Sequence, residues 1–320
     1  MPYHSYDELI RLFTELEAKR RDVVSHEVIG TTVQGRSMYL FRIGYAKKPA
    51  VFFMGSIHGN EHPGAELLYM YAEWLVNEKE PDASWILHNI YTLILPVANP
   101  DGFDAYKRVN ANCVDLNRNF PKGWGGAGTL PGSCCDICRG YSPLDQPESK
   151  AISDVVARYK PKWALDIHSG EEILAYPWCC WMDRPPDHDK FETVCEKYTR
   201  LANERGVKPY SHGQVAWSYP PVDLATPVPV TTYPYVIYVC CGTTIDSWYD
   251  KGVLSMTLEA TSPFNPSYDS LVGTYFPRFL PLAITLSREC AEVRPVTPIS
   301  WLPLLTMAAG TIIIASTPRG

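Results

Sequence analysis

The chain has 320 residues, of which 46% are hydrophobic and 20% are charged, with a formal net charge of −6. The charges are of mixed sign, and the sequence has neither a basic stripe nor an aromatic-basic pattern, which excludes nucleic acid as the expected partner. A chain of this length fits one large α/β core, and no internal repeat is evident in it.

Helix-like and strand-like segments alternate along the chain. Residues 5–21 begin with a capping box formed by Ser5 and Glu8, and they carry an apolar stripe. We expect helices over residues 5–21, 63–79, 191–205 and 275–291, and short strands over residues 50–54, 90–96, 162–167 and 253–259. This alternation predicts an α/β sheet sandwiched by helices.

Residues 58–62, with the sequence His-Gly-Asn-Glu-His, follow the first expected strand and offer ligands to a divalent metal. On a helix, His58 and His62 would bind zinc and Glu61 would be the general base. On a turn, His58 and Glu61 would bind zinc, and a third ligand would come from far along the chain. Gly59 and Pro63 are poor residues for a helix that covers this segment, so we favour the turn.

Two further side chains stand at the ends of expected strands. His168 follows the apolar segment 162–167, and Glu259 ends the alternating segment 253–259. Ligands of open α/β sheets usually bind outside the carboxyl ends of the strands, so these residues are expected to meet the turn. His58, Glu61 and His168 would then hold zinc, with Glu259 as the base. The alternative for Glu259 is a buried, hydrogen-bonded structural carboxylate.

A loop rich in amides and arginines follows the strand over residues 90–96. It begins with Asn-Pro-Asp-Gly-Phe at residues 99–103, and Arg108 and Arg118 lie in the segment that continues to residue 120. Because a guanidinium group binds a carboxylate through a planar, two-pronged contact, this loop is suited to holding an anionic group.

The order of these motifs resembles the zinc metallocarboxypeptidases, the M14 (carboxypeptidase A-like) family, over about residues 5 to 290. The matching motifs are His58-x-x-Glu61, Asn99-Pro100-Asp101-Gly102, Asp115-x-Asn117-Arg118-Asn119, His168, Tyr238 and Glu259. The resemblance implies a mixed central β-sheet sandwiched by α-helices, in a single catalytic domain over residues 1–292.

The resemblance also implies a role for each matching residue. One zinc ion would be held by His58, Glu61 and His168, with Glu259 as the base that deprotonates the zinc-bound water. Asp115 matches a carboxylate that orients the first zinc histidine. The remaining matches are Arg108 for the developing oxyanion, Asn117 and Arg118 for the terminal carboxylate of the substrate, and Tyr238 for the mobile tyrosine that closes over it.

The implied function is hydrolysis of the C-terminal peptide bond of peptides and proteins. In the resembling family, the residue that matches Ile245 lies deep in the pocket for the C-terminal side chain, so Ile245 favours apolar or aromatic residues. Neighbouring residues are also expected to shape the pocket wall: Cys240, Cys241, Thr243 and Thr257. The alternatives are a zinc amidohydrolase that acts on D- or γ-linked cell-wall peptides and a catalytically silent, peptide-binding relative.

Ten cysteines permit up to five disulfide bonds. Their placement suggests a bond from Cys113 to one of Cys134, Cys135 or Cys138. Alternatively, Cys135-x-x-Cys138 is half of a structural metal site or a redox pair. Met1 leads into the first expected helix without a signal peptide, so three locations stay open: the cytoplasm, a membrane reached through the C-terminal tail, and the outside of the cell.

Residues 293–320 are expected to form a linker and an apolar tail. The stretch 299–316 is uncharged and mostly apolar, and its length is near the lower limit for a membrane span. Pro303 and Gly310 weaken this interpretation. The two alternatives are a membrane anchor and a tail that packs on the domain as a strand or helix.

Overall fold

The computed structural model describes residues 3–45, 49–216 and 239–291. Tyr238 and the whole tail beyond residue 292 lie outside these ranges, so the predictions made for them, including the domain boundary, stay predictions. The described elements are α1 (Tyr6–Lys19), β1 (Val24–Thr31), β2 (Ser37–Ile43), β3 (Ala50–Gly55), α2 (Pro63–Asn77), α3 (Pro81–Asn89), β4 (Tyr91–Leu95), α4 (Pro100–Asp104), η1 (Leu116–Arg118), α5 (Pro147–Tyr159), β5 (Trp163–His168), β6 (Ile173–Tyr176), α6 (His188–Glu204), β7 (Ser211–Gln214), α7 (Thr244–Asp250), β8 (Leu254–Glu259), α8 (Tyr268–Ser270), η2 (Leu271–Tyr275) and α9 (Phe276–Ala291).

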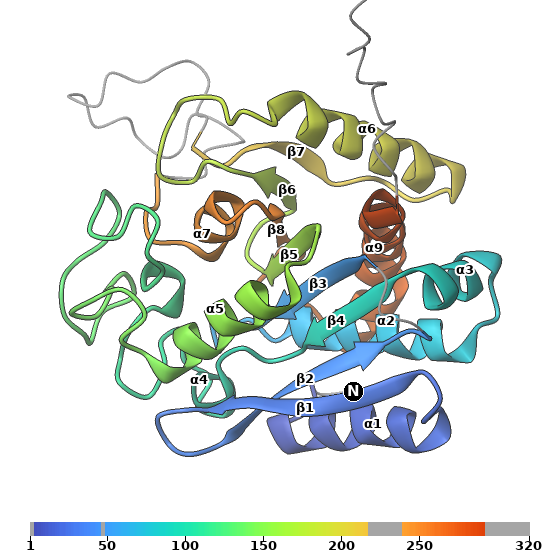
Figure 1. Ribbon diagram of the computed structural model, residues 1–320, viewed down its shortest axis with the longest axis horizontal. Coiled ribbons are helices and arrows are strands. Elements are labelled where there is room, and N and C mark those ends of the chain that lie inside the picture. The colour runs from blue at the N-terminus through green and yellow to red at the C-terminus, as the bar shows by residue number, and fades with distance from the viewer. Residues whose placement is uncertain (1–2, 46–48, 217–238, 292–320) are drawn as a thin grey trace, which may run out of the picture.

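The strands form one mixed sheet in the order β1-β2-β4-β3-β5-β8-β6-β7 (Figure 1). The central strands β4, β3, β5 and β8 are parallel to their neighbours within that group. The pairs β1-β2, β2-β4 and β6-β8 are antiparallel. The mixed central sheet is therefore confirmed, and its parallel centre brings the carboxyl ends of four strands to one edge.

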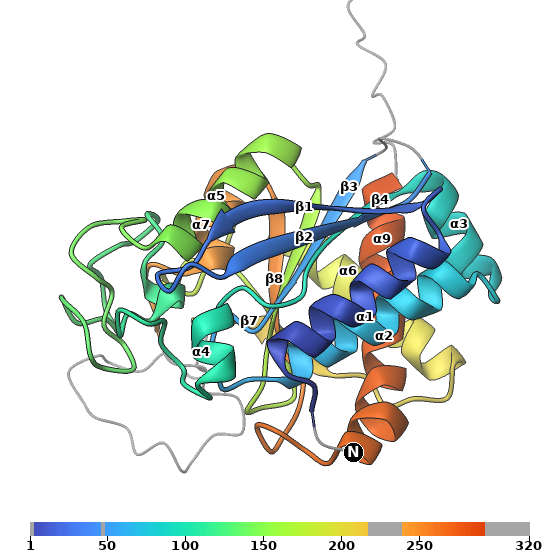
Figure 2. The same cartoon turned by 90° about the horizontal axis from the view of Figure 1, so that it is seen from below.

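Helices cover both faces of this sheet. In β3, Val51 and Phe53 pack in a core cluster with residues of α1, α2, α3, α6 and α9, whereas Phe52 and Met54 pack in a second cluster with residues of α5 and α7. Figure 2 shows α5 and α7 on the opposite side of β1 and β2 from α1 and α2. Because successive strand side chains point to opposite faces, the continuous apolar run at residues 50–54 fits a strand buried on both sides.

All four expected helices and all four expected strands are present, with bounds that differ by a few residues. At the start of α1, the Ser5 side chain accepts a hydrogen bond from the Glu8 amide and the Glu8 carboxylate accepts one from the Ser5 amide, as the capping box predicts. The hairpin of β1 and β2 and the helices α3 and α5 were not predicted. Strand β1 lies at the edge of the sheet, where it is only partly buried, and its apolar signal is weak.

Three disulfide bonds link Cys135 to Cys138, Cys179 to Cys240 and Cys180 to Cys241. The predicted bond from Cys113 is wrong: Cys113 and Cys134 are both thiols, and the Cys134 amide donates to the Cys113 carbonyl oxygen at 2.7 Å. The other two candidate partners of Cys113, Cys135 and Cys138, are bonded to each other across a tight turn. Structural disulfides are compatible with an extracellular location.

Membrane attachment was expected only through residues 299–316, which are not described. Across residues 3–45, 49–216 and 239–291, the structure has no helix with the length and apolar character that a membrane crossing requires.

Candidate active site

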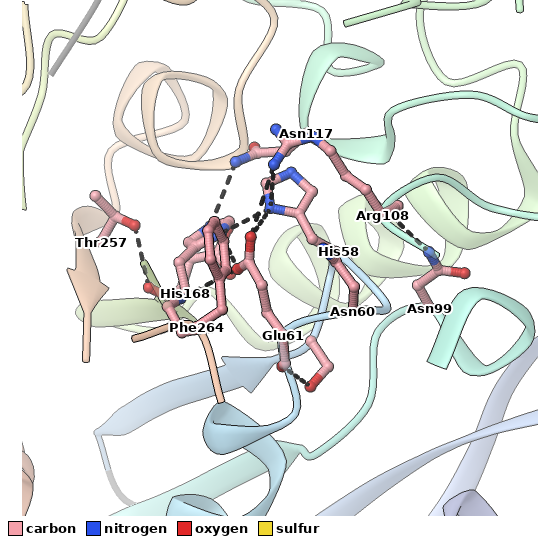
Figure 3. Close-up of polar contacts among 12 residues, drawn as sticks. His58, Asn60, Glu61, Asn99, Arg108, Asn117, His168, Thr257 and Phe264 are labelled. Carbon is pink, nitrogen blue, oxygen red and sulfur yellow. Dashed lines mark hydrogen bonds and ion pairs between the residues drawn. The ribbon is translucent and has the colours of Figure 1, made fainter. Parts of the chain in front are cut away.

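The site lies where three neighbouring parallel strands end. In the register of the sheet, Gly55 of β3 lies opposite Ile167 of β5, and His168 of β5 lies opposite Glu259 of β8. The turn that carries His58 begins directly after β3. Residues that are far apart in sequence therefore meet at one edge, and Figure 3 shows His58, Glu61 and His168 pointing toward one another.

Residues 58–61 form a turn rather than part of a helix, as the sequence predicted. The Glu61 amide donates to the His58 carbonyl oxygen at 3.1 Å, and α2 begins only at Pro63. Gly59 is required by close packing, because a Cβ atom there would lie 2.1 Å from the carbonyl carbon of Gly102. The turn directs the His58 and Glu61 side chains inward together.

His62 lies outside this cluster. Its ring stacks on Phe103 with a centroid distance of 3.8 Å, at the N-terminus of α2. The Asn265 side-chain oxygen accepts a hydrogen bond from the His62 amide at 3.1 Å. The His-x-x-Glu-His segment is therefore not a local three-residue metal site, because its second histidine packs in an aromatic contact.

The potential ligand atoms of His58, Glu61 and His168 lie within 4.8 Å of one another, and all three residues are buried. His58 Nδ1 lies 2.8 Å from Glu61 Oε1 and 3.1 Å from His168 Nδ1. Two imidazole nitrogens and a carboxylate are a common donor set for catalytic zinc, which leaves a fourth position for water. The donor set and its spacing fit zinc.

A carboxylate lies behind each of the two histidines. His58 Nε2 lies 3.2 Å from Asp115 Oδ1, and His168 Nε2 lies 3.1 Å from Asp166 Oδ2. A carboxylate at this position fixes the tautomer and orientation of a ligating imidazole, so that Nδ1 of both rings faces the metal position. Asp115 was predicted, but Asp166 was missed. The signal was available, because Asp166 and His168 are two residues apart on one strand and face the same way.

Asp166 is itself held in place by Thr244. The Thr244 hydroxyl donates to Asp166 Oδ2 at 2.6 Å, and the Thr244 amide donates to the Asn117 side-chain oxygen at 2.9 Å. The start of α7 thus holds both Asn117 and Asp166, whose side chains lie 3.4 Å and 3.1 Å from His168 Nε2. This link between α7 and the loop at Asn117 comes from the tertiary structure alone.

The charges of the cluster shift the pKa values of its members. Burial opposes ionisation of Glu61, but His58 and His168 outweigh it and hold the pKa of the Glu61 carboxyl below its usual range. Burial likewise opposes the charge on Asp115, and Arg108 and Arg118 keep its pKa well below the usual value. Burial lowers the pKa of His168, but Asp166 and Glu61 raise it well above the ordinary value overall. These neighbours therefore favour the charged forms of Glu61, Asp115 and His168.

Glu259 lines the same cavity as the three metal-binding candidates. The loss of hydration raises the pKa of its carboxyl to about 8, although His168 opposes the rise. A carboxyl in such surroundings accepts a proton far more readily than an exposed one, because burial favours its neutral form. Its chemistry is thus suited to general-base work at neutral pH.

The predicted arginines and Asn117 also line this cavity. Arg108 Nη2 lies 2.9 Å from Asp115 Oδ2, and Arg108 Nη1 lies 3.2 Å from His58 Nδ1. Arg118 is buried, and its Nη1 donates to the Asn117 carbonyl oxygen at 2.8 Å. Two cationic groups and an amide therefore stand at one side of the metal position, in surroundings that suit an anion.

The cavity encloses about 240 Å³ and is lined in part by Ile245, which is buried at the start of α7. Cys240, Thr243 and Thr257 also line it, as expected, whereas Cys241 does not and that part of the prediction is wrong. Sequence reasoning also missed Phe264, which is partly exposed at the cavity and packs over Gly170. No periodic or motif signal marked this aromatic residue.

Comparisons with known proteins agree with this geometry. Residues 9–292 match the family described as zinc carboxypeptidase. Carboxypeptidase A4 of Mus musculus is 28% identical over 272 residues, which are 78% of this chain and 59% of the mouse protein. Carboxypeptidase A1 of Rattus norvegicus is 26% identical over 331 residues, which are 97% of this chain and 70% of the rat protein.

Similar folds occur among solved structures. Bovine thrombin-activatable fibrinolysis inhibitor, in complex with tick carboxypeptidase inhibitor, superposes with a TM-score of 0.77 over 90% of this chain and 97% of that chain, at 22% identity. At this identity the similarity shows the fold. Since the family match covers nearly all the described residues and the His-Glu-His cluster lies where three strands end, this chain belongs to the zinc carboxypeptidase family.

Proposed function

We propose that the chain hydrolyses the C-terminal peptide bond of peptides and proteins. The observation that carries this proposal is a single cavity that is lined by a His-Glu-His metal cluster, the half-buried Glu259, and the neighbouring residues Asn117 and Arg118. The metal cluster and Glu259 are suited to hydrolysis, and Asn117 and Arg118 are suited to binding a free carboxylate. The proposal extends family membership to a specific reaction.

The chemical work is divided between a bound zinc ion and two residues. A zinc ion bound by the cluster would act as a Lewis acid and lower the pKa of water. Glu259 accepts the proton of the attacking water and later delivers it to the leaving amine, a role that its raised pKa supports. Arg108 stabilises the negative charge that develops on the carbonyl oxygen, because its guanidinium reaches the edge of the metal cluster.

Recognition of the chain end determines which bond is cut. Arg118 and Asn117 hold the terminal carboxylate, and this contact fixes the last peptide bond over the cluster. Tyr238 closes over the substrate in this proposal, on the strength of the motif order in the sequence. The apolar end of the cavity at Ile245 receives the last side chain and favours apolar or aromatic residues.

The alternative hydrolase, an amidase for D- or γ-linked cell-wall peptides, is not favoured. Asn117 and Arg118 suit an ordinary C-terminal carboxylate, and the curated relatives reported above are carboxypeptidases. A panel of blocked dipeptides that differ in the last residue, assayed with the zinc-loaded chain beside a γ-linked cell-wall peptide, separates the two activities. Cleavage of only the γ-linked peptide would replace the proposed function.

The ligand assignment is tested with two histidine variants. His168→Ala is expected to lose bound zinc and activity, whereas His62→Phe, which preserves the stack on Phe103, is expected to keep both. Glu259→Gln should retain zinc and lose activity, since the amide cannot accept the proton. Binding of a dipeptide without cleavage by the unaltered zinc-loaded chain would instead identify a catalytically silent relative.

A further inference from the structure

We propose that the Cys179–Cys240 disulfide is the specificity-determining wall of the side-chain pocket, and that it selects aromatic over aliphatic C-terminal residues. This inference rests on the proposed carboxypeptidase function. It assigns a substrate class to the pocket and a task to one particular disulfide bond of this chain.

The two sulfur-bearing residues face the cavity together. Cys179 and Cys240 both line it, and they pack in one buried cluster with Ala175, Val215 and Ile245. Cys179 is 2% exposed and Cys240 is 7% exposed. The disulfide is therefore part of the same apolar surface as Ile245, which was predicted to lie at the end of the pocket.

Backbone contacts fix the disulfide in this position. The Cys240 amide donates to the Cys179 carbonyl oxygen at 3.0 Å. The buried carboxylate of Asp246 accepts hydrogen bonds from the amides of Cys179 at 2.8 Å and Cys180 at 2.9 Å. Asp246 directly follows Ile245 on α7. This short helix therefore positions both Ile245 and the backbone of Cys179, which carries one half of the disulfide.

The adjacent disulfide has a different environment. Cys180 and Cys241 do not belong to the cavity lining. Their sulfur atoms pack against the loop over residues 123–126, since a Cβ atom at Gly123 would lie 2.8 Å from Cys180 Sγ and one at Gly126 would lie 2.6 Å from Cys241 Sγ. Both disulfides have the same sequence separation of 61 residues, so they constrain loops of equal length. The chain thus contains its own matched control.

The chemistry of the wall favours an aromatic ring. Sulfur is polarisable and makes favourable contacts with the edge of an aromatic ring, which an aliphatic side chain cannot reproduce. Val215 and Ile245, which pack with the disulfide and also line the cavity, are apolar, so a charged C-terminal side chain placed against them would lose hydration. A planar apolar side chain against Ile245 and the disulfide is the best match.

The test compares two double variants. Cys179→Ala with Cys240→Ala removes the pocket disulfide, and Cys180→Ala with Cys241→Ala removes the neighbouring one. The kcat/KM ratio for blocked dipeptides that end in Phe and in Leu is measured for each zinc-loaded protein. We expect the ratio to fall roughly two- to tenfold in the first variant and to stay unchanged in the second.

Equal shifts in the two variants, or no shift in either, would overturn the inference while leaving the proposed function intact. If the unaltered chain cleaves none of the dipeptides, the proposed function is overturned instead. If the first variant does not fold, Cys179→Ser with Cys240→Ser keeps the side-chain size without the bond. Competition by free phenylalanine and free leucine then reports the same preference through binding, independent of turnover.

Discussion

Asp166 Oδ2 lies 3.1 Å from His168 Nε2, two residues away on the same strand. Both residues are buried, and the Thr244 hydroxyl donates to the same carboxylate oxygen at 2.6 Å. Strand β5 therefore carries both a metal-binding candidate and the group that orients it. This relationship gives the first testable consequence.

Asp166→Asn is expected to weaken zinc binding by roughly 10- to 100-fold, because the amide orients the His168 ring less firmly and makes it less basic. Competition with a chromophoric chelator measures the affinity. Asp154→Asn, at an exposed position of α5, is the matched control and should bind zinc as the unaltered chain does. Equal affinities of the two variants would contradict a positioning role for Asp166.

Zinc affinity is expected to rise with pH. Because the pKa of His168 is raised well above its ordinary value in the ion-free chain, the imidazole carries a proton that the metal must displace. The affinity should rise by about tenfold per pH unit while one proton is displaced, and it should fall as the pH is lowered. Calorimetry in buffers of different ionisation enthalpy counts the released protons. An affinity that stays constant between pH 6 and 8 would contradict this prediction.

Arg118→Lys should weaken selection of a free C-terminus. A lysine cannot reproduce the planar, two-pronged contact with a carboxylate, so kcat/KM for a free-acid dipeptide should fall by roughly 30-fold or more, equivalent to about 2 kcal/mol. The corresponding C-terminal amide should be affected far less. Arg158→Lys, on the exposed side of α5, is the control. Equal losses of kcat/KM for the free-acid dipeptide and its amide would show that Arg118 has only a structural role.

The buried carboxyl of Asp246 is expected to make the free energy of unfolding depend on pH. Burial raises the pKa of its carboxyl from 3.8 to about 6, so the folded chain holds a proton there that the unfolded chain loses between these values. The stability that this group contributes therefore falls as the pH rises through that window, by up to about 3 kcal/mol. The free energy of unfolding in urea, measured for the unaltered chain and for Asp246→Asn, should give a difference that declines between pH 4 and pH 7. A constant difference would contradict the raised pKa.

Much of the fold was predictable because its signals are local. The capping box at Ser5, the apolar run at residues 50–54 and the alternation before Glu259 each depend on a few neighbouring residues, and each predicted its element correctly. Strand β1 gave no such signal, because an edge strand is half exposed and its pattern of apolar residues is mixed. The disulfide prediction at Cys113 was wrong for a related reason: pairing depends on distance in space rather than on spacing in sequence.

The sequence by itself determined the identity of the metal-binding candidates, because Gly59 and Pro63 are incompatible with a helical His-x-x-Glu-His site, and the motif order supplied the partners of His58 and Glu61. Only the tertiary structure decided what surrounds them. Asp166 behind His168, Phe264 beside the cavity and the Cys179–Cys240 bond in its wall depend on contacts between strands and loops distant in sequence. A sequence motif specifies which side chains are present. The orientation of each side chain and the residues around it depend on how distant segments pack, and a motif carries no information about that packing.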